Sequence, residues 1–191
     1  MIAAAGRTIR AALIGFLALG AVAAAPVPEP QGYRLDHYKA PTPATVAGGT
    51  ALDTPGAHKL WQEGGAVWID VLAAPQRPAN LPAQSVWMPL PRRDIPGSLW
   101  LPDIGLGTLS PELEQFFRNH LDAATKGRHD MPVVFYCRAD CWMSWNAAKR
   151  AAAWGYQRVY WYRDGTDGWA AANLPLVRSY PTPRNGAGGT P

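Results

Sequence analysis

The stretch VVFYCRADCWMSWNAAKRAAAWGYQRV, residues 133–159, decides the fold of this chain. Its apolar start, residues 133–137, predicts a buried strand, and its Ala-rich part, residues 146–155, predicts a helix that a glycine ends. The loop between them holds both cysteines of the chain, Cys137 and Cys141. A helix N-terminus presents unpaired amide N–H groups and a positive dipole, so the loop favours an anion or a reactive thiolate.

Helix-like and strand-like segments alternate on both sides of this stretch. Thr54-Pro55 and Ser110-Pro111 are helix-start signals, because a hydroxyl cap precedes proline at the first helical position. Alternating strands and helices pair in parallel through right-handed crossovers, so the pattern predicts an α/β fold. The further predicted strands are short apolar runs at residues 66–71, 85–89, 98–102 and 158–162.

The N-terminus has the residue order of a secretory signal peptide. Arg7 and Arg10 precede an apolar run and a series of small residues, so we expect residues 1–25 to be removed on export to the periplasm. The run is too short to favour a permanent anchor, and no later window is apolar enough to span a membrane. The expected parts after the signal are an extended segment at 26–49, one domain at 50–178 and a disordered tail at 179–191.

The charge balance gives no case for nucleic-acid binding. The chain has 18 basic and 14 acidic residues, and loss of Arg7 and Arg10 with the signal leaves 16 against 14. The remaining basic residues are scattered rather than clustered as on a nucleic-acid-binding face. We therefore expect no nucleic-acid partner.

The lack of suitable histidines excludes a haem site and a zinc site at the two cysteines and leaves three interpretations of the pair open. A c-type haem needs a histidine after the second cysteine, where this chain has Trp142. A zinc site needs about four ligands, but the four histidines are spread along the chain, so we predict no metal. Cys137 could be a buried, inert cysteine; the pair could form a short, labile disulfide; or Cys141 could resolve a persulfide, sulfenate or mixed disulfide on Cys137.

Four segments of the chain, in order, resemble a rhodanese-like domain. They are IDV (69–71), DIPGSLWLP (94–102), the opening stretch, and DGTDGW (164–169). In the second segment Asp94 replaces the histidine of the family pattern. The resemblance covers about residues 50–178 and implies a mainly parallel five-stranded sheet flanked by helices.

The loop CRADCW in an exported chain resembles one subgroup of that family. These are the exported CXXCW-motif proteins associated with pyrroloquinoline quinone (PQQ)-dependent alcohol catabolism, whose cysteines are three rather than four residues apart. The resemblance implies a thiol redox or sulfur-transfer role, a possible interaction with PQQ, and a periplasmic quinoprotein dehydrogenase or redox protein as partner. Cys137 would be the nucleophile and Cys141 the resolving thiol. The substrate would contact the rest of the loop, Arg138, Ala139, Asp140, Trp142, Met143 and Ser144.

The loop also departs from the pattern of sulfurtransferases. Trp142 and Met143 stand where that pattern has an arginine and a serine or threonine, and a missing cation weakens binding of thiosulfate. The alternative is therefore a catalytically inactive module that binds a quinone cofactor or a quinoprotein. Trp142 and Trp145 either pack in the interior or stack on the planar quinone.

Overall fold

A parallel five-stranded sheet forms the centre of the molecule, as predicted. The computed structural model describes residues 25–82 and 84–184, and its sheet has the strand order β1-β6-β5-β2-β4 with every pair parallel. The strand that leads to Cys137, β5, therefore lies in the middle of the sheet. The five strands are β1 (Thr50–Leu52), β2 (Val67–Asp70), β4 (Leu99–Trp100), β5 (Val133–Tyr136) and β6 (Val159–Tyr162).

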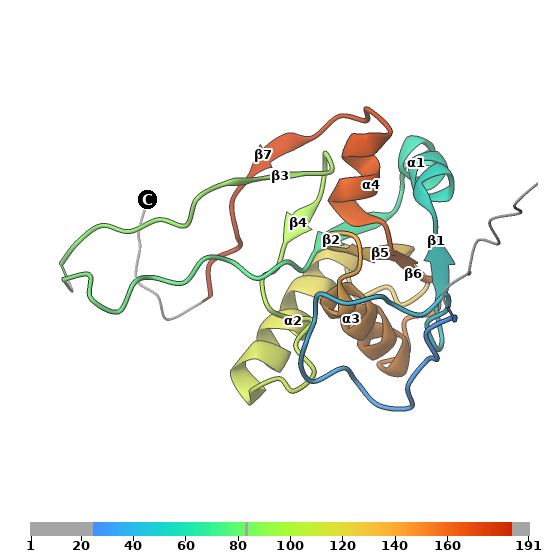
Figure 1. Cartoon of the computed structure of the whole chain (residues 1–191), viewed down its shortest axis with the longest axis horizontal. Helices are drawn as coiled ribbons and strands as arrows, with labels where there is room; N and C mark the ends of the chain where they lie inside the picture. Colours follow the sequence, from blue (N-terminus) through green and yellow to red (C-terminus); the bar gives the residue numbers. More distant parts are fainter. Residues whose placement is uncertain (1–24, 83, 185–191) are drawn as a thin grey trace, which may run out of the picture.

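Two short strands lie outside this sheet and form an antiparallel pair, which we call the β3–β7 ribbon. Its strands are β3 (Arg92–Asp94) and β7 (Val177–Ser179). A long loop connects β2 to β3, and its described residues, 71–82 and 84–91, project from the body of the molecule (Figure 1). The ribbon thus joins the end of this loop to the C-terminal part of the chain.

Helices cover both faces of the sheet (Figure 1). Successive side chains of a strand point to opposite faces, and in β5 Phe135 joins the apolar cluster that contains Trp145 of α3, whereas Tyr136 joins the cluster around Trp169 of α4. Helices α2 and α3 therefore cover one face, and α1 and α4 the other. The helices are α1 (Thr54–Glu63), α2 (Pro111–Thr125), α3 (Trp142–Ala153) and α4 (Gly165–Ala171).

Both helix-start signals mark real helices, although one cap is displaced by a residue. Ser110 caps α2, since its hydroxyl oxygen accepts from the Leu113 amide at 3.2 Å. In α1 the cap is Asp53, which accepts from the Gly56 amide at 2.9 Å. Thr54 is the first helical residue, and its hydroxyl donates instead to Asp164 of the loop after β6. That bond ties α1 to the start of α4.

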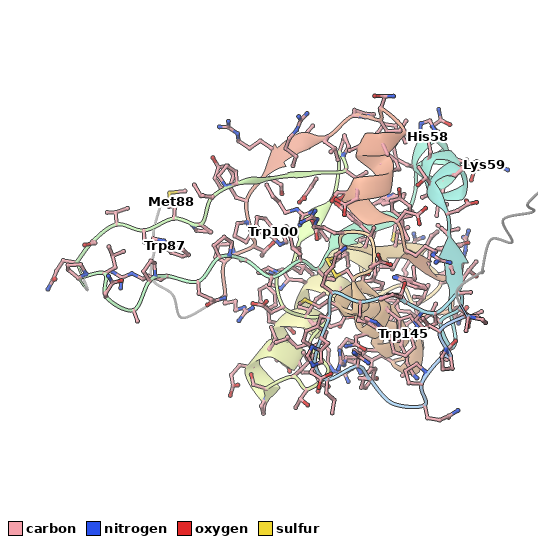
Figure 2. All side chains as sticks on the ribbon, in the orientation of Figure 1. His58, Lys59, Trp87, Met88, Trp100 and Trp145 are labelled. Atoms are coloured by element: carbon pink, nitrogen blue, oxygen red, sulfur yellow. A yellow bond between two sulfur atoms is a disulfide. The ribbon has the colours of Figure 1, made fainter. Side chains whose placement is uncertain are left out.

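The sequence predicts the right number of strands in the sheet but one wrong member. Residues 85–89 form no strand: they belong to the projecting loop, where Val86 is 93% exposed and Met88 66%. Figure 2 labels Trp87 and Met88 on this loop. Proline at 89 and 91 removes backbone donors that a central strand needs. The fifth strand is β1, which was not predicted. Helix α3 also begins at Trp142, four residues before the predicted start at residue 146.

The two chain ends differ in how much the structure describes. Residues 1–24, where the signal peptide is predicted, lie outside the described residues, as do residues 185–191 of the predicted tail. Residues 180–184 contact the domain, because the Thr182 amide donates to the Trp100 carbonyl at 2.8 Å and Arg184 donates to the Pro102 carbonyl at 3.0 Å. In the part of the chain that is described, no helix has the length and apolarity to cross a membrane.

Candidate active site at the two-cysteine loop

The two cysteines lie at the carboxyl edge of the parallel sheet, where ligand sites of α/β proteins usually form. Cys137 directly follows β5 and Cys141 directly precedes α3. They form a disulfide, with Cα atoms 6.2 Å apart. Cys137 is fully buried and Cys141 is 6% exposed. The structure therefore holds the loop in its bridged, oxidised form, with both sulfur atoms largely closed off from solvent.

The start of the loop is held by residues at the beginning of α4. The Thr166 amide and hydroxyl both donate to the Cys137 carbonyl, at 3.0 and 3.3 Å. Gly165 has a φ of 53° and lies so close that an added Cβ would be 2.5 Å from the same carbonyl oxygen. Arg92 Nη2 in turn donates to the Thr166 hydroxyl at 3.1 Å. Cys137 is thus positioned by close backbone packing and by a hydrogen-bond chain from Arg92.

The outer part of the loop faces solvent. Of the residues predicted to contact substrate, Arg138 and Asp140 are exposed and Ala139 is half-buried. Arg138 Nε lies 3.2 Å from Asp167 Oδ1, and the Ala139 amide donates to Asp167 Oδ2 at 3.3 Å. The Asp167 carboxylate therefore accepts from two groups, Arg138 Nε and the Ala139 amide, that were expected to bind an anion. Sequence reasoning did not single out Asp167.

The other three residues predicted to contact substrate are buried in the first turn of α3. Trp142 and Met143 are almost fully buried, and Ser144 has no exposed surface. The Ser144 hydroxyl donates to the Cys141 carbonyl at 2.9 Å and accepts from Trp161 Nε1 at 3.0 Å. In this form of the protein these side chains support the loop from the domain interior.

The N-terminal segment crosses the loop and the start of α3 (Figure 1), and we call its residues 30–46 the strap. Lys39 pairs with Cys141 in an antiparallel β-bridge. The backbone of the strap thus lies against the more exposed cysteine and takes the first free amide of α3. The bridge consists of two hydrogen bonds, from Trp142 N to Tyr38 O at 2.8 Å and from Ala40 N to Asp140 O at 3.1 Å.

Four side chains of α3 hold the strap by donating to its backbone carbonyls. Their positions, 142, 145, 146 and 149, follow the spacing i, i+3, i+4 and i+7 and therefore share one helix face. In the sequence, side chains with N–H donors on one face of an otherwise Ala-rich helix indicate that this face binds another segment, a signal that was missed. The bonds are Trp142 Nε1 to Pro41 O (3.1 Å), Trp145 Nε1 to Thr45 O (2.9 Å), Asn146 Nδ2 to Arg34 O (2.8 Å) and Lys149 Nζ to Gln31 O (2.7 Å).

A group of buried charges lies beside β5 at the same edge of the sheet. Asp70 and Asp94 are buried, and Arg92 Nε lies 2.8 Å from Asp70 Oδ2 and 2.6 Å from Asp94 Oδ1. Burial raises the pKa of Asp70 well above its ordinary value, and Arg92 opposes this only in part. Burial likewise raises the pKa of the Tyr136 hydroxyl, which donates to Ser98. Asp70 Oδ2 and Asp94 Oδ2 are buried atoms without a hydrogen-bond partner among the described residues.

No metal site is formed in the described ranges, 25–82 and 84–184: no three His, Cys, Asp or Glu side chains gather there as metal ligands would. The two acids described above are bridged by a guanidinium instead. They therefore form a buried ion-pair group with Arg92.

Comparison with known proteins adds a family and one structural likeness. The model of the family described as rhodanese-like domain matches residues 56–172, more than half of the chain. The solution structure of the 30 kDa polysulfide-sulfur transferase homodimer from Wolinella succinogenes is similar with a TM-score of 0.43 and 22% identity, over 69% of this chain and 80% of that chain. No curated protein matches the sequence.

Proposed function

We infer a function from one premise: the chain belongs to the rhodanese-like domain family. We propose that it is an exported thiol redox protein whose Cys137 and Cys141 cycle between a dithiol and a disulfide. The observation that carries this proposal is the disulfide at the carboxyl edge of the sheet. Its position suits exchange, because the adjacent helix N-terminus stabilises the thiolate that leaves when the bridge is broken.

Reduction begins at the more exposed sulfur. Cys141 retains slight exposure and Cys137 has none, so an incoming thiolate meets Cys141 Sγ first once the strap has moved. Attack there forms a mixed disulfide on Cys141 and releases Cys137 as a thiolate. A second thiol of the same donor then breaks the mixed disulfide, which leaves the protein as a dithiol and the donor as a disulfide. The two electrons come from this external dithiol.

Oxidation couples the cysteine pair to sulfur chemistry. The Cys137 thiolate attacks the outer sulfur of a persulfide donor, takes up that sulfur atom, and releases the donor as a thiolate. Cys141 then attacks Cys137 Sγ, so that the bond to the outer sulfur breaks and hydrosulfide leaves. The protein disulfide re-forms, and the transferred sulfur carries away the electron pair. Cys137 is thus the nucleophile and Cys141 the resolving thiol.

The contacts of the loop favour a persulfide over a sulfur dianion such as thiosulfate. Asp167 brings a carboxylate to the Ala139 amide, and the Tyr38 carbonyl already accepts from the Trp142 amide. Both contacts remove donors from a bound dianion, and the Asp167 charge repels it. A persulfide depends less on these donors, and movement of the strap away from Cys141 opens the loop to it.

We place this activity in the periplasm beside PQQ-dependent alcohol oxidation, on the resemblance of CRADCW to the exported CXXCW-motif proteins. The partner is then a quinoprotein dehydrogenase or a redox protein that supplies thiol electrons. The alternative, an inert module that binds the quinone itself, needs aromatic faces that a planar ligand can reach. Trp142 and Trp145 are buried, and the strap takes both indole N–H groups, which favours the redox function.

Trapping the persulfide tests the proposal. The protein is reduced, separated from the reductant and treated with a small-molecule persulfide, and its intact mass is then measured by mass spectrometry. Cys141→Ser should gain one sulfur atom, the parent should instead lose two hydrogens and release hydrosulfide, and Cys137→Ser should do neither. Equal behaviour of the two single variants would refute the assigned roles. If the parent shows no thiol chemistry and PQQ quenches its tryptophan fluorescence saturably, the binding module replaces the redox protein.

A further inference from the structure

Two exposed arginines face each other across the β3–β7 ribbon. Arg93 and Arg178 are register partners in the antiparallel pair, and residues directly opposite one another project from the same face. Like charges in this arrangement repel each other and destabilise the strand pair. A cross-strand pair of cations therefore needs another reason to be present, such as an anion that both of them bind.

Asp94 is the one carboxylate in the chain segments that contain and flank the pair. Apart from Asp94, the segments that contain or flank the two strands, residues 71–93 and 168–191, contain no Asp or Glu but five arginines. Across the described ranges neither Arg93 nor Arg178 takes part in an ion pair; Arg93 Nη2 donates to the Leu176 carbonyl at 3.0 Å. The five arginines are Arg77, Arg92, Arg93, Arg178 and Arg184.

The nearest acids of the ribbon are already neutralised on its other face. Side chains alternate along a strand, so Asp94 and Arg92 point away from the face that carries Arg93. Asp94 is buried, and its carboxylate lies 2.6 Å from Arg92 Nε. Arg92 also holds Asp70 at 2.8 Å. The charge on the Arg93 face therefore stays uncompensated within the ribbon.

An open cavity lies at this place, with a volume of about 420 Å³. Its lining combines Arg93 and Arg178 with Pro91 and Leu176. It also includes Arg92, whose guanidinium is held by Asp70 and Asp94. Guanidinium groups bind carboxylates, sulfonates and phosphates through paired N–H donors, and apolar walls accept a short hydrocarbon part. We propose that Arg93 and Arg178 form a binding site for a small organic oxyanion, with its charged head between the guanidinium groups and its apolar part against Pro91 and Leu176.

This site is separate from the disulfide and stands without the redox function. It would hold a ligand on the ribbon whether or not the cysteines react. Sulfate, which offers the head alone, and butanesulfonate, which adds a short apolar tail, are suitable probes. NMR signals of the arginine Nε–Hε groups report binding directly, with sodium chloride at equal ionic strength as the reference.

Both probes should shift the Arg93 and Arg178 signals saturably, with butanesulfonate binding several-fold more tightly. Arg178→Gln should weaken binding about tenfold or more, because one charge-assisted pair of hydrogen bonds is lost. A matched control is Arg128→Gln, an exposed arginine between α2 and β5 at the opposite edge of the sheet, which should bind as the parent does.

Stability without ligand gives a second readout. At low salt Arg178→Gln should unfold at the same temperature as the parent or higher, because the cross-strand repulsion is gone, whereas loss of a structural arginine would lower it. The proposal is overturned if chloride produces the same shifts as sulfate, if Arg178→Gln binds as tightly as the parent, or if Arg128→Gln loses binding equally.

Discussion

Replacing Trp145 by phenylalanine tests whether the strap controls access to the disulfide. Trp145 is fully buried on α3, and its indole N–H donates to the Thr45 carbonyl of the strap at 2.9 Å (Figure 2 labels Trp145). Phenylalanine keeps a six-membered aromatic ring in place of the bicyclic indole but has no N–H group to donate a hydrogen bond. The loss of one neutral hydrogen bond costs about 1 kcal/mol, which raises the population with an open strap about fivefold.

The rate of disulfide reduction measures that opening. Because Cys137 is fully buried and Cys141 is covered by the bridge from Lys39, we expect a small dithiol to react only with molecules whose strap is open. Trp145→Phe should therefore be reduced about fivefold faster than the parent under native conditions, as followed by alkylation and intact mass. Hydrogen exchange at strap amides should accelerate by a similar factor.

Trp169→Phe is the matched control. Trp169 is also fully buried, and its indole N–H also donates to a backbone carbonyl, that of Pro175 at 2.8 Å. Its loss should lower global stability by a similar amount without opening the strap. If Trp169→Phe accelerates reduction as much as Trp145→Phe, or if the strap amides exchange faster while the reduction rate is unchanged, the strap does not control access.

Two further substitutions test the buried charges and the packing beneath the loop. Burial raises the pKa of Asp70 above 3.8, so as pH rises the folded state keeps its proton after the unfolded chain has released it. The resulting stabilisation is fully present below pH 3.8 and is lost as pH rises through the raised pKa of the folded state. Asp70→Asn should remove that decline in urea midpoints measured between pH 4 and 8, and parallel curves for variant and parent would contradict the assignment. Gly105→Ala would place a Cβ 2.1 Å from the Met143 carbonyl oxygen and should lower the free energy of unfolding in urea by about 1–3 kcal/mol. In the control Gly32→Ala the added Cβ meets nothing within 4 Å, so stability should change by less than about 0.5 kcal/mol. Equal urea midpoints for these two variants would rule out a close contact at Gly105.

The central part of the fold was predictable because its local sequence patterns agree with the elements that form there. Residues 133–159 combine an apolar run, a loop and an Ala-rich helix, and each appears in the structure as β5, the disulfide loop and α3. The error at residues 85–89 has a physical cause, since an apolar run shows a tendency to pair but not whether a partner strand is present. β1 has only three residues and becomes a strand through its pairing with β6.

The candidate site was predictable in position but not in surroundings. The strand–loop–helix order places Cys137 at the carboxyl edge of the sheet, and that is where it lies. Asp167 on α4 was missed because contacts made by distant segments carry no local pattern. The strap over Cys141 left a signal only in the polar-ended residues on one face of α3. Whether Arg138 and its neighbours contact a substrate stays a prediction.

The strap also bears on the order in which the molecule folds. Its bonds to α3 join residues 100 to 119 positions apart, whereas the disulfide joins residues four positions apart. The entropy lost on closing a loop grows with its length, so contacts between distant residues form later than local ones. We therefore expect the sulfur atoms to pair while the strap is still free. The oxidant that makes the bridge meets an open loop in a folding chain, and every thiol that breaks it afterwards meets a closed one.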